Sequence, residues 1–226
     1  MTLSLIIPVY NERAAIGACL ANLAALEGEV EVLFADGGST DGTAEAIAAA
    51  GYRVLSCPKG RAAQMNAAAG AAGGEVLWFS HCDSLLPPDG PEQIRRAAAA
   101  GAAFGCFHIA FDYDGPFMGC NTFFSNFRAR RWHIAFGDQG IFVRRDLFEE
   151  LGGFPNLPLI EDYELSRRMK ARKIPLTVLP GRIVTSARRY RRKNPLLTMA
   201  KMFYLRCLYR AGVDIEKIAR LYRDVR

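Results

Sequence analysis

The sequence lacks the segments that would assign it to export or to a membrane. Its start, MTLSLIIPVYNE, has no basic stretch ahead of the apolar run and soon meets a proline and charges, unlike a signal peptide. It contains no run of about eighteen apolar residues that could cross a membrane as a helix. The six cysteines are scattered, with no CxxC pair and no cluster with histidine at zinc spacing. We therefore expect a cytoplasmic protein with free thiols.

Several catalytic motifs are missing as well. There is no GxxxxGK[ST] loop and no GxGxxG loop, the two common phosphate-binding fingerprints. With only three histidines and no GxSxG turn, a serine-hydrolase triad is poorly supported. The glycine-rich segment DGGSTDG at 36–42 has no lysine. It is predicted to form a turn in which Thr40 or Asp41 can cap the following helix.

Positive charge is scarce in the first part of the chain. Residues 1–100 hold 6 of the 29 Lys and Arg but 11 of the 23 Asp and Glu. The basic excess is concentrated at 188–193, RRYRRK. Such a run suits phosphates, a membrane surface or nucleic acid. No recognised nucleic-acid-binding module accompanies it, so we expect no nucleic-acid partner.

The residues that are present predict an α/β fold. The 226 residues, half of them hydrophobic, are enough for one sizeable core. Apolar runs alternate with helical patterns, which predicts a Rossmann-like, mostly parallel sheet flanked by helices. Strands are expected at 3–9, 30–35, 52–56, 75–80, 103–112 (where the strand could run antiparallel), 139–143, 176–179 and 183–186. Helices are expected at 13–26, 43–50, 61–72, from 87 to about 100, and at 116–134, 145–151, 162–173, 195–211 and 214–225.

The stretch EVLWFSHCDSLL, residues 75–86, is the most informative part of the chain. Its apolar run needs cover on both faces and so predicts an inner strand. Ligands of open α/β sheets bind beyond the carboxyl ends of strands, where His81 and Asp83 follow. Two residues apart in extended backbone, their side chains would point the same way. Together they could hold a divalent cation that carries phosphates, or they could simply belong to a polar loop.

Other acidic side chains follow other strands. Glu12 comes after the first strand and Asp36 after the second. Each alone is more simply a loop acid or a helix cap. Together with Asp83, they make three acidic groups at neighbouring strand ends, which favours a crevice that binds a nucleotide.

A family resemblance rests on several segments taken together. Across nearly its whole length, the chain resembles a family 2 glycosyltransferase with the GT-A fold. The segments that carry the resemblance, in the right order and spacing, are IIPVYNE, FADGGSTDGT, HCD, GDQGIFVRR and EDYELSRR. Within this family, the chain resembles a small bacterial subgroup associated with radical-SAM enzymes and arsenosugar biosynthesis. That resemblance lies in the segments GRAAQMNAA, GDQGIFVRR, GGFPNLPLIEDYELSRR and VTSARRY. The resemblance implies a GT-A domain at 1–190, divided into a nucleotide-binding half at 1–100 and an acceptor half at 101–190. A C-terminal helical extension at 191–226 would pack on it.

The resemblance also implies residue roles. It places Asp162 as the catalytic base, and His81 and Asp83 in a metal motif that commonly reads Asp-x-Asp. The histidine favours Mn²⁺ over Mg²⁺ as the divalent cation. The residues implied for nucleotide binding are Pro8, Tyr10, Glu12, Asp36 and Arg61. Those implied for the acceptor or the diphosphate are Asp138, Gln139, Glu161, Arg188 and Arg189.

The implied activity is a metal-assisted, inverting transfer of a sugar from a nucleotide-diphosphate sugar, with UDP the expected nucleotide, to an acceptor hydroxyl that the sequence does not identify. One alternative is a sugar-phosphate nucleotidyltransferase, but 10–13, YNER, is not the glycine-rich loop with arginine and lysine that such an enzyme needs. Another is a non-catalytic sugar-nucleotide-binding protein.

The last third of the chain leaves two interpretations open. The helix expected at 195–211 carries apolar residues with cations among them, and the basic run 188–193 precedes it. It could be an ordinary amphipathic helix packed on the core. It could instead make a peripheral contact with the inner face of a membrane, beside a lipid-linked acceptor.

Overall fold

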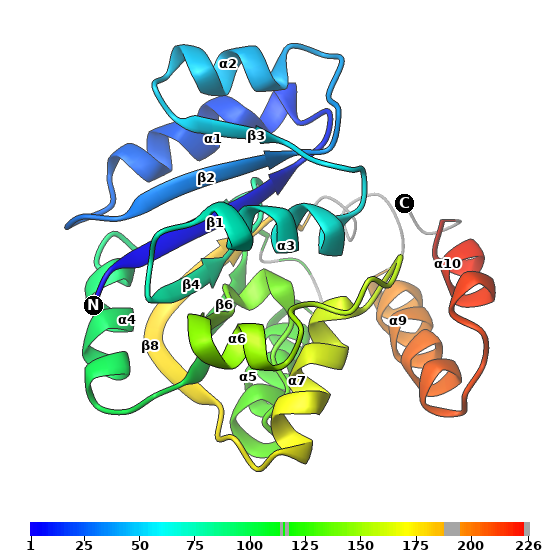
Figure 1. Ribbon diagram of the computed structural model, residues 1–226. Coiled ribbons are helices and arrows are strands. Elements are labelled where there is room, and N and C mark those ends of the chain that lie inside the picture. Colours follow the sequence, from blue (N-terminus) through cyan, green and yellow to red (C-terminus); the bar gives the residue numbers. More distant parts are fainter. Residues whose placement is uncertain (114, 116–117, 188–194, 224–226) are drawn as a thin grey trace.

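The structure is a computed structural model that describes residues 1–113, 115, 118–187 and 195–223. Within these residues, one sheet has the strand order β3-β2-β1-β4-β7-β6-β8-β5 (Figure 1). In its first half, β1 pairs in parallel with β2 and β4, and β2 pairs in parallel with β3. The strands are β1 (Leu3–Val9), β2 (Glu31–Asp36), β3 (Arg53–Ser56) and β4 (Val76–Phe79). The connecting helices are α1 (Arg13–Ala24), α2 (Thr43–Ala49) and α3 (Arg61–Ala71). The predicted parallel βαβ half is confirmed, with element ends within two residues.

The second half of the sheet is mixed. β6 runs antiparallel to β7 and parallel to β8, and β7 also pairs antiparallel with β4. The prediction that the strand at 103–112 could run antiparallel is thus confirmed for its pairing with β7. The strands are β5 (Ser84–Leu85), β6 (Phe104–Phe111), β7 (Phe142–Arg144) and β8 (Thr177–Thr185). The helices are α4 (Gly90–Ala99), α5 (Met118–Trp132), α6 (Arg145–Glu150) and α7 (Glu161–Ala171).

One strand prediction in this half is wrong. Two short strands were expected at 176–179 and 183–186, but β8 is a single strand. Its register against β6 shifts at the Phe107–His108 step, because Leu179 pairs with Phe107 and Arg182 with His108. Pro180 and Gly181 are the extra residues of this bulge. A bulge accommodates a proline and a glycine, which do not fit a regular strand.

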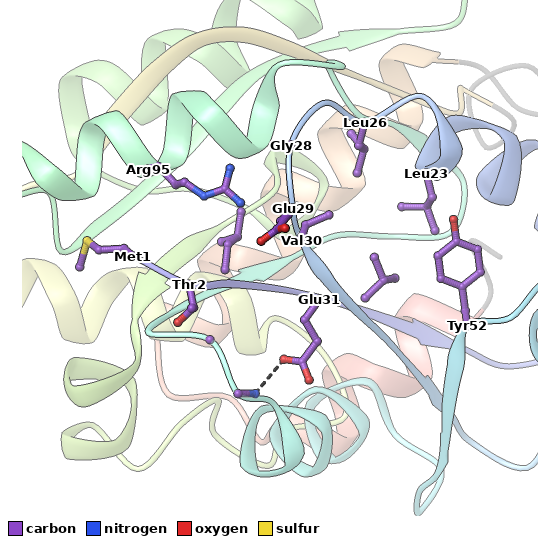
Figure 2. A pocket seen from close by; sticks show the side chains of 14 residues that line it. Met1, Thr2, Leu23, Leu26, Gly28, Glu29, Val30, Glu31, Tyr52 and Arg95 are labelled. Carbon is purple, nitrogen blue, oxygen red and sulfur yellow. Dashed lines mark hydrogen bonds between the residues drawn. The ribbon is translucent and has the colours of Figure 1, made fainter.

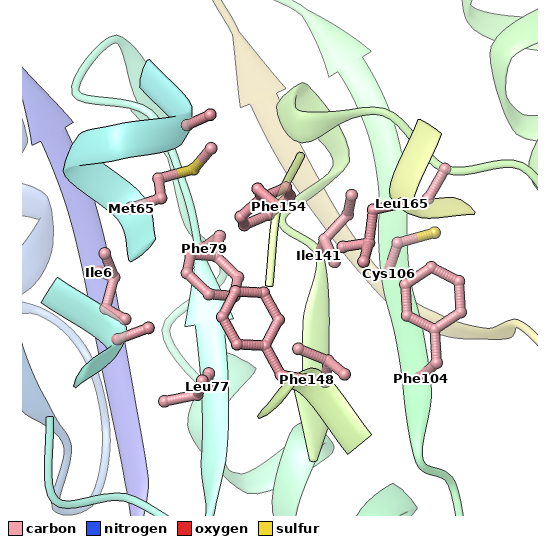
Figure 3. Packing of buried hydrophobic residues seen from close by; sticks show 14 of the residues in the cluster. Ile6, Met65, Leu77, Phe79, Phe104, Cys106, Ile141, Phe148, Phe154 and Leu165 are labelled. Carbon is pink, nitrogen blue, oxygen red and sulfur yellow. The ribbon is translucent and has the colours of Figure 1, made fainter. Parts of the chain in front are cut away.

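The core has one apolar layer on each face of the sheet. Figure 3 shows one layer, in which Phe79 of β4 lies among Met65 of α3, Phe148 of α6 and Phe154. The Phe79 ring centroid is 5.2 Å from that of Phe148 and 4.8 Å from that of Phe154. The next residue back, Trp78, points to the opposite face and is fully buried there. The prediction that β4 is an inner strand covered on both faces is therefore confirmed.

The C-terminal helices α9 (Pro195–Arg210) and α10 (Ile215–Arg223) pack beside the start of α7 (Figure 1). Leu205 and Ile218 are buried against Leu159 and Ile160, the two residues before α7. The hydroxyl of Tyr209 also donates to the Glu164 carboxylate of α7 at 3.0 Å. Among the helices described, none is long and apolar enough to cross a membrane.

Candidate active site

The loops that follow β1 and β2 are tied together. The Asn11 amide donates to Ser39 Oγ at 2.9 Å, and Asn11 Oδ1 accepts the Thr40 amide, also at 2.9 Å. The Glu12 amide donates to Thr43 Oγ1 at 2.9 Å. Asn11 takes up a left-handed conformation, with φ 53°, that asparagine tolerates better than most residues. These bonds fix the two loops side by side at the carboxyl edge of the sheet.

Asp36 shapes the second of these loops. Its side chain is only 6% exposed and accepts hydrogen bonds from the Gly38 amide at 3.1 Å and the Ser39 amide at 3.0 Å. The Ser39 hydroxyl donates to it at 2.5 Å. A base or ribose that bound to Asp36 would therefore have to hydrogen-bond to a carboxylate that already accepts hydrogen bonds from its own turn.

A buried amide that the sequence analysis missed joins the same strand ends. Nε2 of Gln64, in α3, donates to the Val9 carbonyl at 2.8 Å and to the Ala35 carbonyl at 2.7 Å. Gln64 is 4% exposed. The only signal in the sequence is a polar side chain within an alanine-rich helix, which also carries Asn66. Gln64 braces β1 against β2 directly beneath the candidate nucleotide loops.

The base-binding residues implied at the end of β1 have an unforeseen neighbour. Tyr10 is 40% exposed, and Lys59 Nζ lies 3.8 Å from the centre of its ring. Pro8 lies within β1, opposite Ala35 of β2. An exposed aromatic ring covered by an ammonium group can offer a planar surface together with positive charge. This suits a nucleotide base that carries phosphates.

The local geometry expected at the metal motif is wrong. Residues 81–84 form a turn, closed by the Ser84 amide donating to the His81 carbonyl at 3.2 Å, and are not extended. The chain turns because β5 begins at Ser84 and pairs with β8. Cys82 points inward and is 5% exposed. A hydrogen bond with Cys19 and burial raise the pKa of the Cys82 thiol, so it anchors the turn as a neutral group. His81 and Asp83 are left partly exposed.

His81 and Asp162 meet at Gly137. Asp162 lies in the first turn of α7, and its Oδ2 accepts the Gly137 amide at 2.7 Å. A Cβ atom added to Gly137 would lie 2.8 Å from His81 Nε2 and 3.2 Å from Asp162 Oδ2. The two side chains therefore flank one point, which only glycine leaves open. The structure thus brings His81, one of the two residues that the resemblance implies for the metal, close to Asp162, the residue that it implies for the base.

The acidic and imidazole groups fit an ion that is shared with a substrate. Among the described residues, no group of three or more His, Cys, Asp or Glu side chains could hold a metal by itself. Mg²⁺, by contrast, commonly binds through one or two protein ligands plus substrate phosphates and water. His81 and Asp83, partly exposed on one turn, provide such a pair.

An ion pair connects the two halves of the chain at this site. Arg61, at the start of α3, donates through Nε to Oε1 of Glu161, the first residue of α7. Burial lowers the pKa of Arg61, but the charges of Glu161 and Asp162 and the bond to Glu161 outweigh it, so the pKa is raised. Burial, together with Asp162, raises the pKa of Glu161 despite the opposing charge of Arg61. Glu161 is 1% exposed, which favours a supporting role over contact with substrate.

Arg128 of α5 is a second residue that the sequence analysis missed. Its Nη2 donates to Gln139 Oε1 at 2.8 Å and its Nε to the Ile134 carbonyl at 3.2 Å. Its guanidinium lies 3.5 Å from the centre of the Phe136 ring. Burial lowers the pKa of Arg128 to about 10, while the carboxylates of Asp138 and Asp162 oppose that shift. A basic helix end, FRARRW at 127–132, was the only signal.

Gln139 is an internal brace. It is fully buried, and its Oε1 also accepts the Phe136 amide at 3.2 Å. It thereby fixes the turn that presents the Gly137 amide to Asp162. The sequence had instead led us to expect that Gln139 contacts the acceptor or the diphosphate. Asp138 of the same turn is partly exposed. Arg188 and Arg189, the other two residues expected at the diphosphate, lie outside the described residues.

A large cavity lies at the other end of the strands. It has a volume of about 900 Å³ and is lined by the first residues of β1 and β2, together with Tyr52 and Arg95 (Figure 2). Its Glu31 carboxylate already accepts the Gly73 amide at 2.7 Å, as Figure 2 shows. Because His81 and Asp162 lie at the carboxyl edge of the sheet, this cavity is separate from the candidate site.

Comparisons with known proteins agree with this fold. Residues 4–152 match the family model described as glycosyl transferase family 2. Among curated proteins, none matches this sequence. The fold is similar to that of a mannosyltransferase from Pyrobaculum calidifontis in complex with GDP-Man and Mn²⁺. That alignment has a TM-score of 0.69 and 20% identity, and it covers 99% of this chain and 69% of the other.

Two further solved structures are similar. Residues 1–349 of S. aureus TarS, in complex with UDP-GlcNAc, align with a TM-score of 0.66 at 20% identity, over 83% of this chain. This chain spans 59% of that fragment. Glucosyl-3-phosphoglycerate synthase from Mycobacterium tuberculosis, in complex with Mn²⁺, UDP and glucosyl-3-phosphoglycerate, aligns with a TM-score of 0.61 at 18% identity. That alignment covers 94% of this chain and 81% of the other.

We predict that Arg61→Gln destabilises the protein by about 1–3 kcal/mol, less than for a fully buried pair because the Arg61 side chain is 39% exposed. The loss should grow with pH. Burial raises the pKa of Glu161 even beside the guanidinium, and removal of Arg61 raises that pKa further, whereas in the unfolded chain the carboxyl keeps its ordinary pKa. A raised folded-state pKa gives stability below the unfolded pKa that is lost as pH rises through the folded one.

Thermal unfolding between about pH 5 and pH 8 measures this effect. The double variant Arg61→Gln/Glu161→Gln is the matched control, because it removes the titrating group and should flatten the profile. If the single variant and the wild-type protein show parallel pH profiles, the ion pair does not carry this stability.

Proposed function

The chain belongs to glycosyl transferase family 2, and we propose that it transfers a sugar from a nucleotide-diphosphate sugar to an acceptor hydroxyl with inversion. The observation that carries the proposal is the meeting of Asp162 and His81 at Gly137, at the carboxyl edge of the sheet. Structures with similar folds hold GDP-Man, UDP-GlcNAc or UDP, which supports a nucleotide-linked donor. We propose UDP as the nucleotide, bound by the loops around Tyr10, Glu12 and Asp36.

Asp162 is the proposed general base. A sugar acceptor must lose its hydroxyl proton as it attacks, so a carboxylate has to lie within about 3 Å of that oxygen. The Gly137 amide fixes one Asp162 oxygen at 2.7 Å, and the Tyr163 amide donates to the other at 2.6 Å. Both bonds set the direction in which the carboxylate points. One in-line displacement, with the base on the acceptor side, inverts the anomeric carbon.

His81 and Asp83 are the proposed ligands of a divalent cation. Such an ion would neutralise the charge that develops on the leaving diphosphate. The imidazole of His81 favours Mn²⁺ over Mg²⁺. Two similar structures contain Mn²⁺, which supports a cation of this kind. Arg188 and Arg189 are proposed to share the diphosphate charge, on the basis of the sequence alone.

The biological setting is a further part of the proposal. The segments that resemble the radical-SAM-associated subgroup support a role in arsenosugar biosynthesis, carried out in the cytoplasm. A peripheral contact with the inner membrane face is supported by α9, which leaves Leu197 and Phe203 exposed at 69% and 63%. Aliphatic and aromatic side chains near a basic run are typical of surfaces that bind anionic lipid.

We predict that Asp162→Asn lowers turnover by about 10²–10⁴-fold while donor binding is nearly unchanged. The amide keeps the shape of the side chain and can accept one of the two backbone N–H groups that the Asp162 oxygens accept, but it cannot take a proton from the acceptor. Single-turnover transfer from a panel of nucleotide sugars, beside calorimetric titration with UDP, measures the two quantities separately. A loss confined to UDP affinity would make Asp162 a binding residue.

We predict that Asp83→Ala removes most of the Mn²⁺-dependent part of UDP binding, because Asp83 is the only carboxylate in the proposed ligand pair. His81→Asp should keep activity and shift the metal preference toward Mg²⁺, because a carboxylate is the harder ligand. Calorimetry of UDP with each metal tests both variants. If His81→Ala behaves like the wild-type protein with both metals, the imidazole is a neighbour of the ion and not a ligand.

We predict that the protein sediments with anionic lipid vesicles at low salt and does not sediment with neutral ones. The double variant Leu197→Ser/Phe203→Ser should lose this binding, because it removes the two most exposed apolar side chains of α9. UDP binding by this variant is the control for its folding. No sedimentation of the wild-type protein at low salt would indicate a soluble acceptor.

A further inference from the structure

A second cavity, of about 500 Å³, lies between α5 and strands β6 and β8. One wall is basic and is formed by His108 of β6, Arg130 of α5 and Arg182 of β8. An aromatic wall is formed by Phe123 and Phe127 of α5. None of these five side chains belongs to the site around Asp162.

The basic wall is assembled by the bulge in β8. The register shift puts Arg182 directly opposite His108 in the β6–β8 pairing. From α5, Nη2 of Arg130 donates to Nε2 of His108 at 3.0 Å. Burial, followed by the charges of Arg130 and Arg182, lowers the pKa of His108, so the imidazole is neutral at pH 7 and accepts this bond. His108 therefore holds the Arg130 guanidinium in place at the cavity.

The charges of this wall are not balanced within the cavity. Among the described residues that line it, none is acidic. Two guanidinium groups that line one cavity repel each other, and the attraction of both to a bound anion would offset that repulsion. Arginine pairs are suited to phosphate because their planar forks donate several hydrogen bonds to its oxygens.

The aromatic wall is exposed to solvent. Phe123 is 63% exposed and Phe127 is 42% exposed. Their rings stack, with centroids 6.0 Å apart and planes inclined by 20°. Phe124 and Trp132 extend the same exposed aromatic surface along α5. Exposed apolar surface of this extent beside a cavity is characteristic of a ligand-binding site.

We propose that this cavity binds an amphipathic organic phosphate, with its phosphate group on Arg130 and Arg182 and its apolar part on Phe123 and Phe127. The site is independent of the proposed transfer reaction, since no residue of the candidate active site takes part. It shares two elements with that site, however: α5, which also carries Arg128, and β6. The Phe107 carbonyl, which precedes His108, accepts Gln139 Nε2 at 3.5 Å. A ligand in the cavity would therefore lie beside the brace that positions the Gly137 turn.

Calorimetry with two soluble probes, phenyl phosphate and inorganic phosphate, tests the proposal in metal-free buffer with and without UDP. Phenyl phosphate should bind more tightly than inorganic phosphate, and UDP should not displace it. Arg130→Gln and Arg182→Gln should each weaken binding of both probes roughly tenfold to a hundredfold, as loss of a charged hydrogen bond does. Phe127→Ser should remove the preference for phenyl phosphate and leave inorganic phosphate binding unchanged.

Arg131→Gln is the matched control, because Arg131 is an exposed arginine of the same helix that does not line the cavity. It should bind both probes like the wild-type protein. Thermal unfolding of each variant checks that it folds, and Arg182→Lys, which keeps the charge, should retain part of the affinity. Dihexanoyl phosphatidic acid, used as a third probe, distinguishes the source of the phosphate. Tighter binding than phenyl phosphate indicates a lipid headgroup, and weaker binding indicates a soluble phosphate ester.

Three results would overturn the proposal. The first is no binding of phenyl phosphate by the folded wild-type protein. The second is an equal loss of binding in Arg131→Gln and Arg130→Gln, which would indicate general attraction to a basic surface. The third is displacement of phenyl phosphate by UDP, which would assign the binding to the diphosphate site.

Discussion

The pairing of Arg61 with Glu161 is the interaction on which the candidate site depends most. It joins residues one hundred positions apart, at the first turns of α3 and α7. A carboxylate that is 1% exposed is stable in its ionised form only beside a cation, so α7 can begin where it does only if α3 places Arg61 there. Asp162 is the next residue of α7. The ion pair that closes the two halves of the chain therefore also positions the proposed base.

Gly137 extends the same constraint to the metal motif. Its amide bonds Asp162 on one side, and the absence of a side chain leaves room for His81 on the other. The turn that carries Gly137 is in turn held from beneath by Gln139 and Arg128. Polar groups that are buried and hydrogen-bonded in this way rigidify the segment they hold. The candidate site is thus built on a rigid polar layer, with its reactive groups only partly exposed above that layer.

The sequence could predict the elements whose signal is local. The strand at 3–9 and the apolar run at 76–79 are buried on both faces, and their hydrophobic patterns alone identify them. β8 was predicted as two strands on either side of Pro180 and Gly181, whereas the pairing with β6 that makes it one strand is a long-range interaction. β5, with two residues, exists only through its pairing with β8.

The site was predictable to a similar degree. Polar residues at strand ends could be found from the strands, which led to Asp36, His81 and Asp83. Which oxygens of Asp36 are already occupied by its own turn depends on loop conformation, which has no pattern in the sequence. The inward turn of Cys82 depends likewise on the pairing of β5. Gln64 and Arg128 could not be predicted because their hydrogen-bond partners are set by the fold: Gln64 bonds the carbonyls of two strands, and Arg128 bonds the loop that follows α5 and the side chain of Gln139.

The C-terminal helices belong to the architecture of the site. Ile160, which precedes α7, has φ 60°, a left-handed conformation that is strained for a β-branched residue and typically costs about 1–3 kcal/mol. Its side chain is 7% exposed because Leu205 of α9 and Ile218 of α10 cover it. Burial of this apolar cluster offsets the backbone strain, and the strained residue sets the direction in which α7 begins. From α9, Arg206 also lies 5.3 Å from the ring of Phe136, on which Arg128 stacks. The geometry of Asp162 is therefore maintained from both ends of the chain, by Arg61 of α3 and by the packing of α9 and α10.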